Sequence, residues 1–260
     1  MTFPFFKPKG PAPRIVDLQA PLDRIYAVGD IHGRIDHLEA MDQLIAAELA
    51  ETPEIAAAVI YLGDYIDRGP HSAHVLDHLT APAPYSASRI CLIGNHDRML
   101  LDVVDGRIAP QDWLDLGGAS TLMSYSGESG GLSRLSRRAL RQKVLDLVPE
   151  RHIRFLRALP EAARSAQVLF SHAGGNPGKQ LEAQTVADLT ERRPEESEGG
   201  SAPKHGLISV HGHMRETIFL DKVFRICVDM TGARGDVLGA LRLDCEKMSR
   251  RFLTVTDKEK

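Results

Sequence analysis

Short apolar runs that end in glycine turns dominate the first hundred residues. Three of these runs are apolar almost throughout, as expected of strands buried on both faces of a sheet. They lie at 24–28, 58–62 and 89–93. Apolar residues recur at helical spacing over 35–49, and a second, shorter helix is predicted over 70–79. The alternation predicts a β-α-β-α-β unit with a parallel sheet.

The second half of the chain continues this α/β pattern. Residues 98–160 are predicted to be mostly helical, with a Gly/Ser-rich break at 126–131. Further strand-like runs lie at 167–170, 207–210, 223–228, 238–243 and 251–256. We therefore expect one α/β domain over 21–257. Prolines crowd residues 1–20, which predicts an extended or disordered N-terminal arm.

Composition narrows the classes of partner. The chain has 260 residues, of which 43% are hydrophobic and 26% charged, and its formal net charge is −3. This balance gives no general attraction to a nucleic-acid polymer or an anionic membrane. No stretch approaches the roughly 20 apolar residues of a membrane span. Three widely spaced cysteines, Cys91, Cys227 and Cys245, fit a reducing compartment, so we expect a cytoplasmic protein of undetermined oligomeric state.

The central stretch is Gly63-Asp64-Tyr65-Ile66-Asp67-Arg68-Gly69, which directly follows the second apolar run. Asp64 offers oxygen ligands to a divalent cation, and Arg68 presents a planar fork suited to phosphate oxygens. A metal ligand and a phosphate clamp four residues apart indicate metal-assisted phosphoryl chemistry.

Polar residues follow four other apolar runs as well. Because ligands bind open α/β sheets at the carboxyl ends of the strands, we expect these side chains to converge. The candidates are Asp30 and His32, Asp64, Asn95 with His96, His172, and His211 with His213. Carboxylate, imidazole and amide groups without thiolate suit Mn, Fe or Zn better than Ca. Their number exceeds the needs of one ion and favours two ions that share a carboxylate.

Five motifs in order resemble the phosphoprotein phosphatase family of calcineurin-like metallophosphoesterases. They are Gly29-Asp30-Ile31-His32-Gly33, Gly63 through Gly69, Gly94-Asn95-His96-Asp97, His172-Ala173-Gly174 and Gly212-His213. The likeness is greatest to the bacterial serine/threonine phosphatase branch, near the symmetrical diadenosine tetraphosphate hydrolases. It implies a metallophosphoesterase four-layer sandwich, with two mixed β-sheets flanked by helices.

The resemblance also implies residue roles. The first metal would be bound by Asp30, His32 and Asp64. Asp64 would bridge to the second metal, completed by Asn95, His172 and His213. His96 would be the general acid, oriented by Asp67, and Arg68 would hold the phosphate. Arg193 is the candidate for a further phosphate-binding arginine, with Arg192 as its substitute, whereas His211 matches no family position and is expected behind the ligands or at the surface.

The same resemblance leaves two substrate classes open. Asp67-Arg68 favours a protein phosphatase that cleaves phosphoserine and phosphothreonine by direct attack of metal-bound hydroxide, with two divalent ions, Mn²⁺ before Fe or Zn. Asp97 stands where those enzymes usually carry glutamate, which favours instead a hydrolase of diadenosine tetraphosphate or another nucleotide. A catalytically inactive scaffold would be expected to lack a ligand or Arg68, and none is missing.

Overall fold

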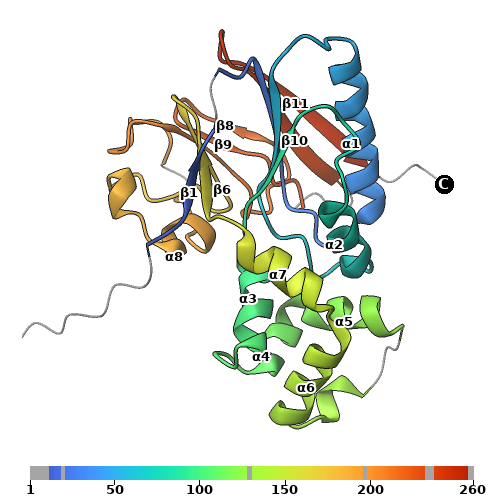
Figure 1. Ribbon diagram of the computed structural model, residues 1–260. Coiled ribbons are helices and arrows are strands. Elements are labelled where there is room, and N and C mark those ends of the chain that lie inside the picture. Colours follow the sequence, from blue (N-terminus) through green and yellow to red (C-terminus); the bar gives the residue numbers. More distant parts are fainter. Residues whose placement is uncertain (1–11, 19–20, 128–130, 196–197, 232–236, 257–260) are drawn as a thin grey trace, which may run out of the picture.

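Two mixed β-sheets lie face to face in the computed structural model, with helices outside them and a helical segment below (Figure 1). The structure describes residues 12–18, 21–127, 131–195, 198–231 and 237–256. The predicted fold class, two mixed sheets flanked by helices, is confirmed.

The first sheet contains the predicted β-α-β-α-β unit. Its strands follow the order β11-β10-β2-β3-β4. They are β2 (Arg24–Val28), β3 (Ala57–Tyr61), β4 (Ser88–Cys91), β10 (Val237–Asp244) and β11 (Ser249–Thr256). The pairs β2–β3 and β3–β4 are parallel, whereas β10 pairs antiparallel with both β2 and β11. The three glycine turns therefore leave the sheet at one edge.

The second sheet carries the histidine motifs, with the order β1-β5-β6-β7-β9-β8. Its strands are β1 (Ile15–Asp17), β5 (Ala162–Arg164), β6 (Val168–Ser171), β7 (Ile208–His211), β8 (Leu220–Asp221) and β9 (Arg225–Cys227). The parallel pairs β6–β7 and β7–β9 place the ends of β6 and β7 next to each other. His172 and His213 consequently leave the same edge of this sheet.

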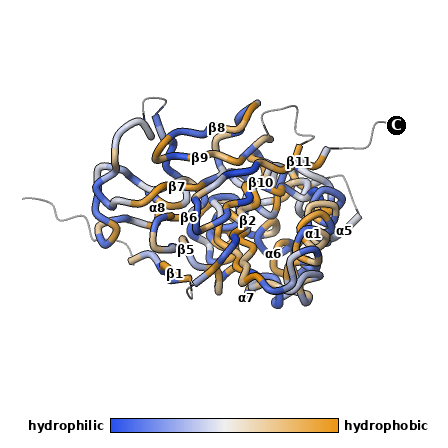
Figure 2. The backbone as a smooth tube through the Cα atoms, turned by 90° about the horizontal axis from the view of Figure 1, so that it is seen from above, coloured by the Kyte–Doolittle hydropathy of each residue, from blue (hydrophilic) through white to orange (hydrophobic). Residues whose placement is uncertain are grey.

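Side chains that alternate between the two faces of each strand form the two hydrophobic cores on either side of the first sheet. Ile25 and Ile60 of the first sheet pack with Phe170 and Val210 of the second in the core between the sheets. Their neighbours along the strands face the other way, into the core beneath the outer helices. Apolar residues, orange in Figure 2, recur along the strands and along α1, as this layered packing requires.

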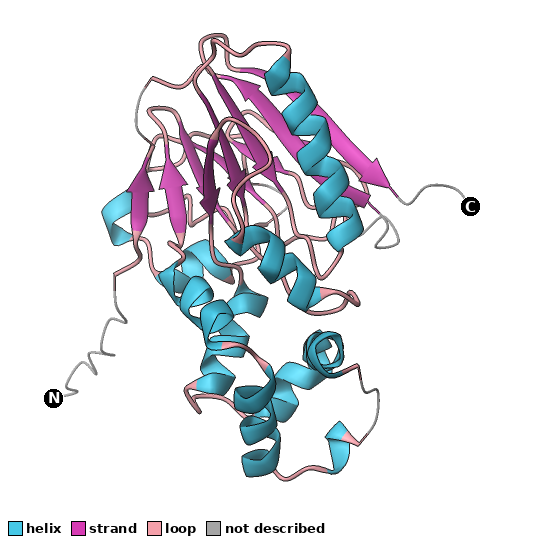
Figure 3. Cartoon of the chain, turned by 45° about the vertical axis from the view of Figure 1, so that its right-hand side comes forward, coloured by secondary structure: helices cyan, strands magenta, loops and turns pink. Residues whose placement is uncertain are grey.

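Helices cover the outer faces and form the lower segment. The elements α1 (Ile35–Ala50) and α2 (Ser72–Thr80) cover the first sheet, and η3 (Leu181–Ala183) and α8 (Val186–Thr190) lie on the second. The lower segment (Figure 3) comprises α3 (Asn95–Val104), α4 (Pro110–Trp113), the π-helical η1 (Leu114–Gly118), α5 (Ala119–Ser126), η2 (Leu132–Arg134), α6 (Arg137–Leu147) and α7 (Glu150–Ala158). Among the described residues, no helix has the length and apolarity needed to cross a membrane.

The N-terminal arm differs in part from the expectation. Residues 15–17 form β1, an edge strand that pairs in parallel with β5. The backbone amide of Leu18 extends this pairing by donating to Arg164 O at 2.9 Å. Both strands have only three residues, too few to give a periodic signal, so the sequence indicated neither. The prolines at 4, 8 and 11 lie outside the described residues.

Candidate metal centre

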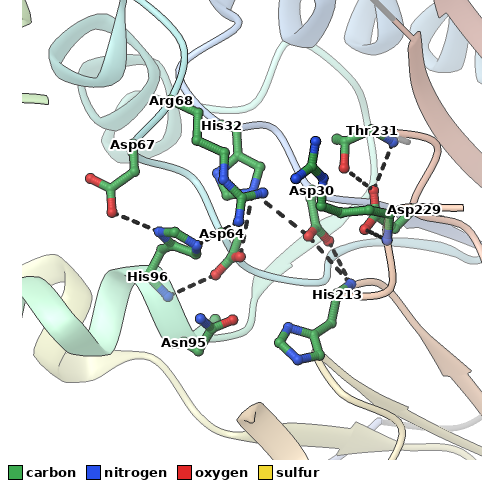
Figure 4. Close-up of polar contacts among 12 residues, drawn as sticks. Asp30, His32, Asp64, Asp67, Arg68, Asn95, His96, His213, Asp229 and Thr231 are labelled. Atoms are coloured by element: carbon green, nitrogen blue, oxygen red, sulfur yellow. Dashed lines mark hydrogen bonds and ion pairs between the residues drawn. The ribbon is translucent and has the colours of Figure 1, made fainter. Parts of the chain in front are cut away.

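Two groups of potential ligands meet at the edge of the sheets, and Asp64 belongs to both. One group contains His32, Asp64 and His96, and the other contains Asp64, His172 and His213. Within each group the ligand atoms lie within 4.8 Å of one another. Figure 4 shows His32, His96 and His213 around the carboxylate of Asp64. The arrangement is the one that a bridging carboxylate requires.

His32 defines the first side of the centre. Its Nδ1 lies 2.8 Å from the carbonyl oxygen of Ile66, a contact that orients the other ring nitrogen toward the ligands. Nε2 lies 3.5 Å from Asp64 Oδ2 and 3.9 Å from Asp30 Oδ2. Burial lowers the pKa of His32 to about 3, which keeps the imidazole in the neutral form that binds metals.

His172 contacts the other ligands on the second side of the centre. Its Nε2 lies 2.9 Å from Asn95 Oδ1, 3.1 Å from His213 Nδ1 and 3.4 Å from Asp64 Oδ2. Its other ring nitrogen lies 3.1 Å from the carbonyl oxygen of Leu62. Asp30 lies between the two sides, because its Oδ1 is 3.8 Å from His172 Nδ1 and accepts from the backbone amide of His213 at 3.1 Å. The structure thus brings all six predicted metal ligands together.

The electrostatics of this cluster fit divalent cations. Burial opposes the charged form of both His172 and Asp64. Asp64 and Asp30 nevertheless raise the pKa of His172 to about 10, and His172 holds the pKa of Asp64 well below its ordinary value. Burial, and then Asp229, raise the pKa of Asp30. Two buried carboxylates therefore require a positive neighbour, which metal ions would supply in place of a proton. His213 presents Nδ1 to the other ligands, because Nδ1 is the ring nitrogen that lies 3.1 Å from His172 Nε2.

The backbone at the centre is strained. Five non-glycine site residues have positive φ, between 44° and 72°, a region that side chains disfavour. They are His32, Asp64, Asp67, Arg68 and His213. Gly63 and Gly94 allow their two turns to touch, because a Cβ on Gly94 would lie 2.1 Å from Asp64 Oδ1. Strain of this kind clusters at functional sites, where the surrounding structure enforces it.

His96 and Arg68 stand beside the first ligand group. His96 Nδ1 lies 2.8 Å from Asp67 Oδ2, and Asp64 and Asp67 raise the pKa of His96 although burial opposes them. The guanidinium of Arg68 donates to Nε2 of both neighbouring histidines, at 2.6 Å to His32 and 2.9 Å to His96. Arg68 therefore presents its charge at the place where a phosphoryl group would meet the acid. The roles of both residues remain predictions.

Asp97 has a structural function that the sequence analysis missed. Its carboxylate accepts from the backbone amides of Asp64 at 2.9 Å, Tyr65 at 3.1 Å and Gly94 at 3.0 Å. Burial and the nearby charge of Asp64 raise the pKa of Asp97 to about 7. This side chain ties two glycine turns together. The position of Asp97 within Gly-Asn-His-Asp was the only feature of the sequence that could have indicated this function. Its partners are backbone amides, which leave no trace in the sequence.

Of the two candidate arginines, Arg193 is the one available to a ligand. Arg192 pairs with Glu198 at 2.9 Å and donates to Gly175 O at 3.2 Å. Arg193 is exposed, and its charge helps burial and His172 to lower the pKa of His213 to about 4. Phosphate binding by Arg193 stays a prediction.

His211 lies behind the ligands, which is one of the two positions expected for it. It is buried, and its Nε2 accepts from Arg225 Nε at 2.9 Å. The other expectation, a place at the surface, is wrong. His211 belongs to neither ligand group among the described residues.

An open cleft of about 800 Å³ adjoins the centre. Asp30, His32 and Arg68 line it on the side of the metal ligands. Arg34 and Arg215 also line it, so three guanidinium groups surround the same space. The carboxylates of Asp30 and Asp36 also line the cleft, so both signs of charge border it.

Comparisons with known proteins agree with this geometry. A family model described as calcineurin-like phosphoesterase matches residues 23–222. No curated protein sequence matches the chain.

Solved structures resemble the fold at low sequence identity. A provisionally assigned diadenosine tetraphosphatase is 21% identical with a TM-score of 0.61, and the match covers 95% of this chain and 100% of that one. A cold-active protein-tyrosine phosphatase of a psychrophilic Shewanella species is 17% identical with a TM-score of 0.55, covering 93% and 82%. A metallophosphoesterase from Sphaerobacter thermophilus is 14% identical with a TM-score of 0.52, covering 90% and 88%. These likenesses concern the fold alone.

Proposed function

The chain belongs to the calcineurin-like phosphoesterase family, and we propose that it removes phosphate from phosphoserine and phosphothreonine in proteins by direct attack of an activated water. The observation that carries this proposal is Asp64, which is shared by two ligand groups beside Arg68. The pairing of Asp67 with His96 adds a candidate proton donor for an alcohol leaving group. Serine and threonine alcohols need such a donor because their alkoxides are poor leaving groups.

In the proposed reaction, the bond between phosphorus and the seryl or threonyl oxygen breaks as the oxygen of water bonds to phosphorus. Two divalent ions, Mn²⁺ in the first instance, would lower the pKa of the water and neutralise phosphoryl oxygens. Arg68 would bind the phosphoryl oxygens with its planar fork. His96 would give its proton to the leaving oxygen while Asp67 holds the opposite ring nitrogen.

The substrate class is tested by a direct comparison with Mn²⁺ present. We expect kcat/KM for a phosphoserine or phosphothreonine peptide to exceed that for diadenosine tetraphosphate by more than about 10-fold, since the site is matched to one class of leaving group. Phosphate release and nucleotide products are measured in the same preparations. EDTA should abolish both activities, and addition of Mn²⁺ should restore them. Rapid formation of ADP with no release of phosphate from peptides would overturn the phosphoprotein proposal.

A second candidate is the hydrolysis of dinucleoside polyphosphates or other nucleotides. The observation that favours it is the cleft, where Arg34 and Arg215 join Arg68 around one space. Arg34 already contacts Asp36 at 3.3 Å, whereas the exposed side chain of Arg215 has no hydrogen-bond or ion-pair partner among the described residues. Arg215 is thus the group best placed to bind a phosphate that is not transferred.

Replacing Arg215 with alanine separates the two candidates. If nucleotides are the substrates, KM for diadenosine tetraphosphate should rise at least about 10-fold, the usual effect of losing a charge-assisted hydrogen bond. KM for a phosphopeptide without flanking acidic residues should stay within about 2-fold, because only the transferred phosphate meets Arg68. Arg138→Ala, at an exposed position on α6 that lines a different cavity, is the matched control. An unchanged KM for the dinucleotide would remove the argument for this candidate.

A further inference from the structure

The turn that contains Asp67 and Arg68 is held by the helical segment below the sheets. Asp67 is fully buried and lies in the loop that connects β3 to α2, whereas Trp113 belongs to α4 and Thr121 to α5. Trp113 Nε1 donates to both oxygens of Asp67, at 3.1 Å to Oδ1 and 2.9 Å to Oδ2. Thr121 Oγ1 donates to Oδ1 at 2.7 Å. Two elements about fifty residues away in the chain therefore surround one carboxylate.

These contacts decide which way the carboxylate faces. A carboxylate offers about four lone-pair positions on its two oxygens. Thr121 occupies a position on Oδ1, and Trp113 bridges both oxygens with its shorter contact to Oδ2. The contact to His96 Nδ1 is made by the same Oδ2 at 2.8 Å. Figure 4 shows Asp67 directed at His96 from the side opposite Asp30. The orientation of the imidazole therefore depends on donors that never touch it.

The backbone of the same segment supports the turn. The amide of Asp67 donates to Thr121 Oγ1 at 2.9 Å, and the amide of Arg68 donates to the carbonyl oxygen of Gly117 at 3.2 Å. Gly117 belongs to η1 and has a φ of 122°, and a Cβ there would lie 2.9 Å from the amide nitrogen of Arg68. The backbone of Gly117 is non-helical and marks a kink between two helices at this point. The contacts help to enforce the positive φ of Asp67 and Arg68.

We propose that Trp113 and Thr121 are positioning residues for the candidate acid, acting through Asp67. They fix the carboxylate, the carboxylate fixes the ring of His96, and the ring then points Nε2 at the leaving oxygen. This inference rests on the proposed phosphoester hydrolysis. It assigns to the helical segment a part in catalysis that is separate from binding the metals or the phosphate.

Leaving-group dependence tests the assignment. An enzyme that protonates its leaving group well is insensitive to the basicity of that group, and a misplaced acid restores the sensitivity. In Trp113→Phe and in Thr121→Val, we expect kcat for phenyl phosphate to fall about 10-fold to 100-fold, within the range of general acid catalysis. For 2,4-dinitrophenyl phosphate, whose leaving group needs no proton, kcat should change less than about 2-fold, with KM unchanged for both esters.

Met123→Ala is the control, because Met123 lies on α5 and is partly exposed. The variant should leave kcat for both esters as in the wild type. An equal loss of kcat on the good and the poor leaving group in Trp113→Phe, or no loss on either, would overturn the proposal. Whether the wild-type protein hydrolyses both esters with Mn²⁺ tests the proposed phosphoester hydrolysis separately from the positioning role of Trp113 and Thr121.

A crystal structure of each variant provides a readout that does not depend on turnover. In Trp113→Phe we expect the Asp67 carboxylate to rotate and the contact between its Oδ2 and His96 Nδ1 to lengthen beyond hydrogen-bond range. A variant in which this contact stays at its wild-type length would contradict the proposal, even if the variant were less stable.

Discussion

Asp64→Asn is expected to lower kcat by more than about 10³-fold, because the change removes the charge that the two ligand groups share. Asp64 Oδ2 lies 3.5 Å from His32 Nε2 and 3.4 Å from His172 Nε2, so its charge lies between the two ligand groups. An asparagine oxygen can still accept the hydrogen bond that the amide of His96 donates to Oδ1 at 3.0 Å. The fold should therefore survive while the metal content falls.

The measurement combines phosphoesterase kinetics with the number of bound metal ions per chain. Asp146→Asn, at an exposed position on α6, is the matched control and should keep wild-type values of both. A variant at position 64 that retains two ions and more than about a tenth of the wild-type kcat would show that Asp64 is not the shared ligand.

His96→Asn should give the second largest effect, a fall in kcat of about 10²-fold to 10⁴-fold at nearly unchanged metal content. His96 lies close enough to His32 and Asp64 to be counted as a possible ligand, so the two roles must be separated. Its contact with Asp67 at 2.8 Å orients Nε2 for proton transfer and favours the acid role. The rate is therefore expressed per occupied metal site.

His74→Asn, at an exposed position on α2, controls for the loss of an imidazole. It should leave both rate and metal content unchanged. The acid role would be refuted by a His96→Asn variant that loses metal while each remaining occupied site turns over at the wild-type rate.

The central site was predictable because its residues follow strands with a strong signal. Runs such as Ala58–Leu62 are apolar throughout, since both faces of the sheet are covered, and the turn that follows must place Asp64 at the sheet edge. The same reasoning places Asp30 and Asn95, which follow neighbouring strands. Local pattern was sufficient there because the topology of a parallel sheet converts sequence order into proximity.

The contacts that support the site could not be predicted in this way. Asp97 binds backbone amides, which every sequence contains, and Trp113 meets Asp67 only because α4 folds beneath the first sheet. Short strands such as β1 and β5 form by pairing with neighbouring strands rather than from their own periodicity. Tertiary packing determines all of these features, so no local sequence pattern predicts them.

The most direct test of the dinuclear centre is the crystal structure of the protein loaded with Mn²⁺, with the ions located by their anomalous scattering. We expect two peaks about 3.5–4 Å apart, both in contact with the carboxylate of Asp64. His32 should lie at one ion, with His172 and His213 at the other. A single ion, or two ions that do not share Asp64, would contradict the dinuclear centre.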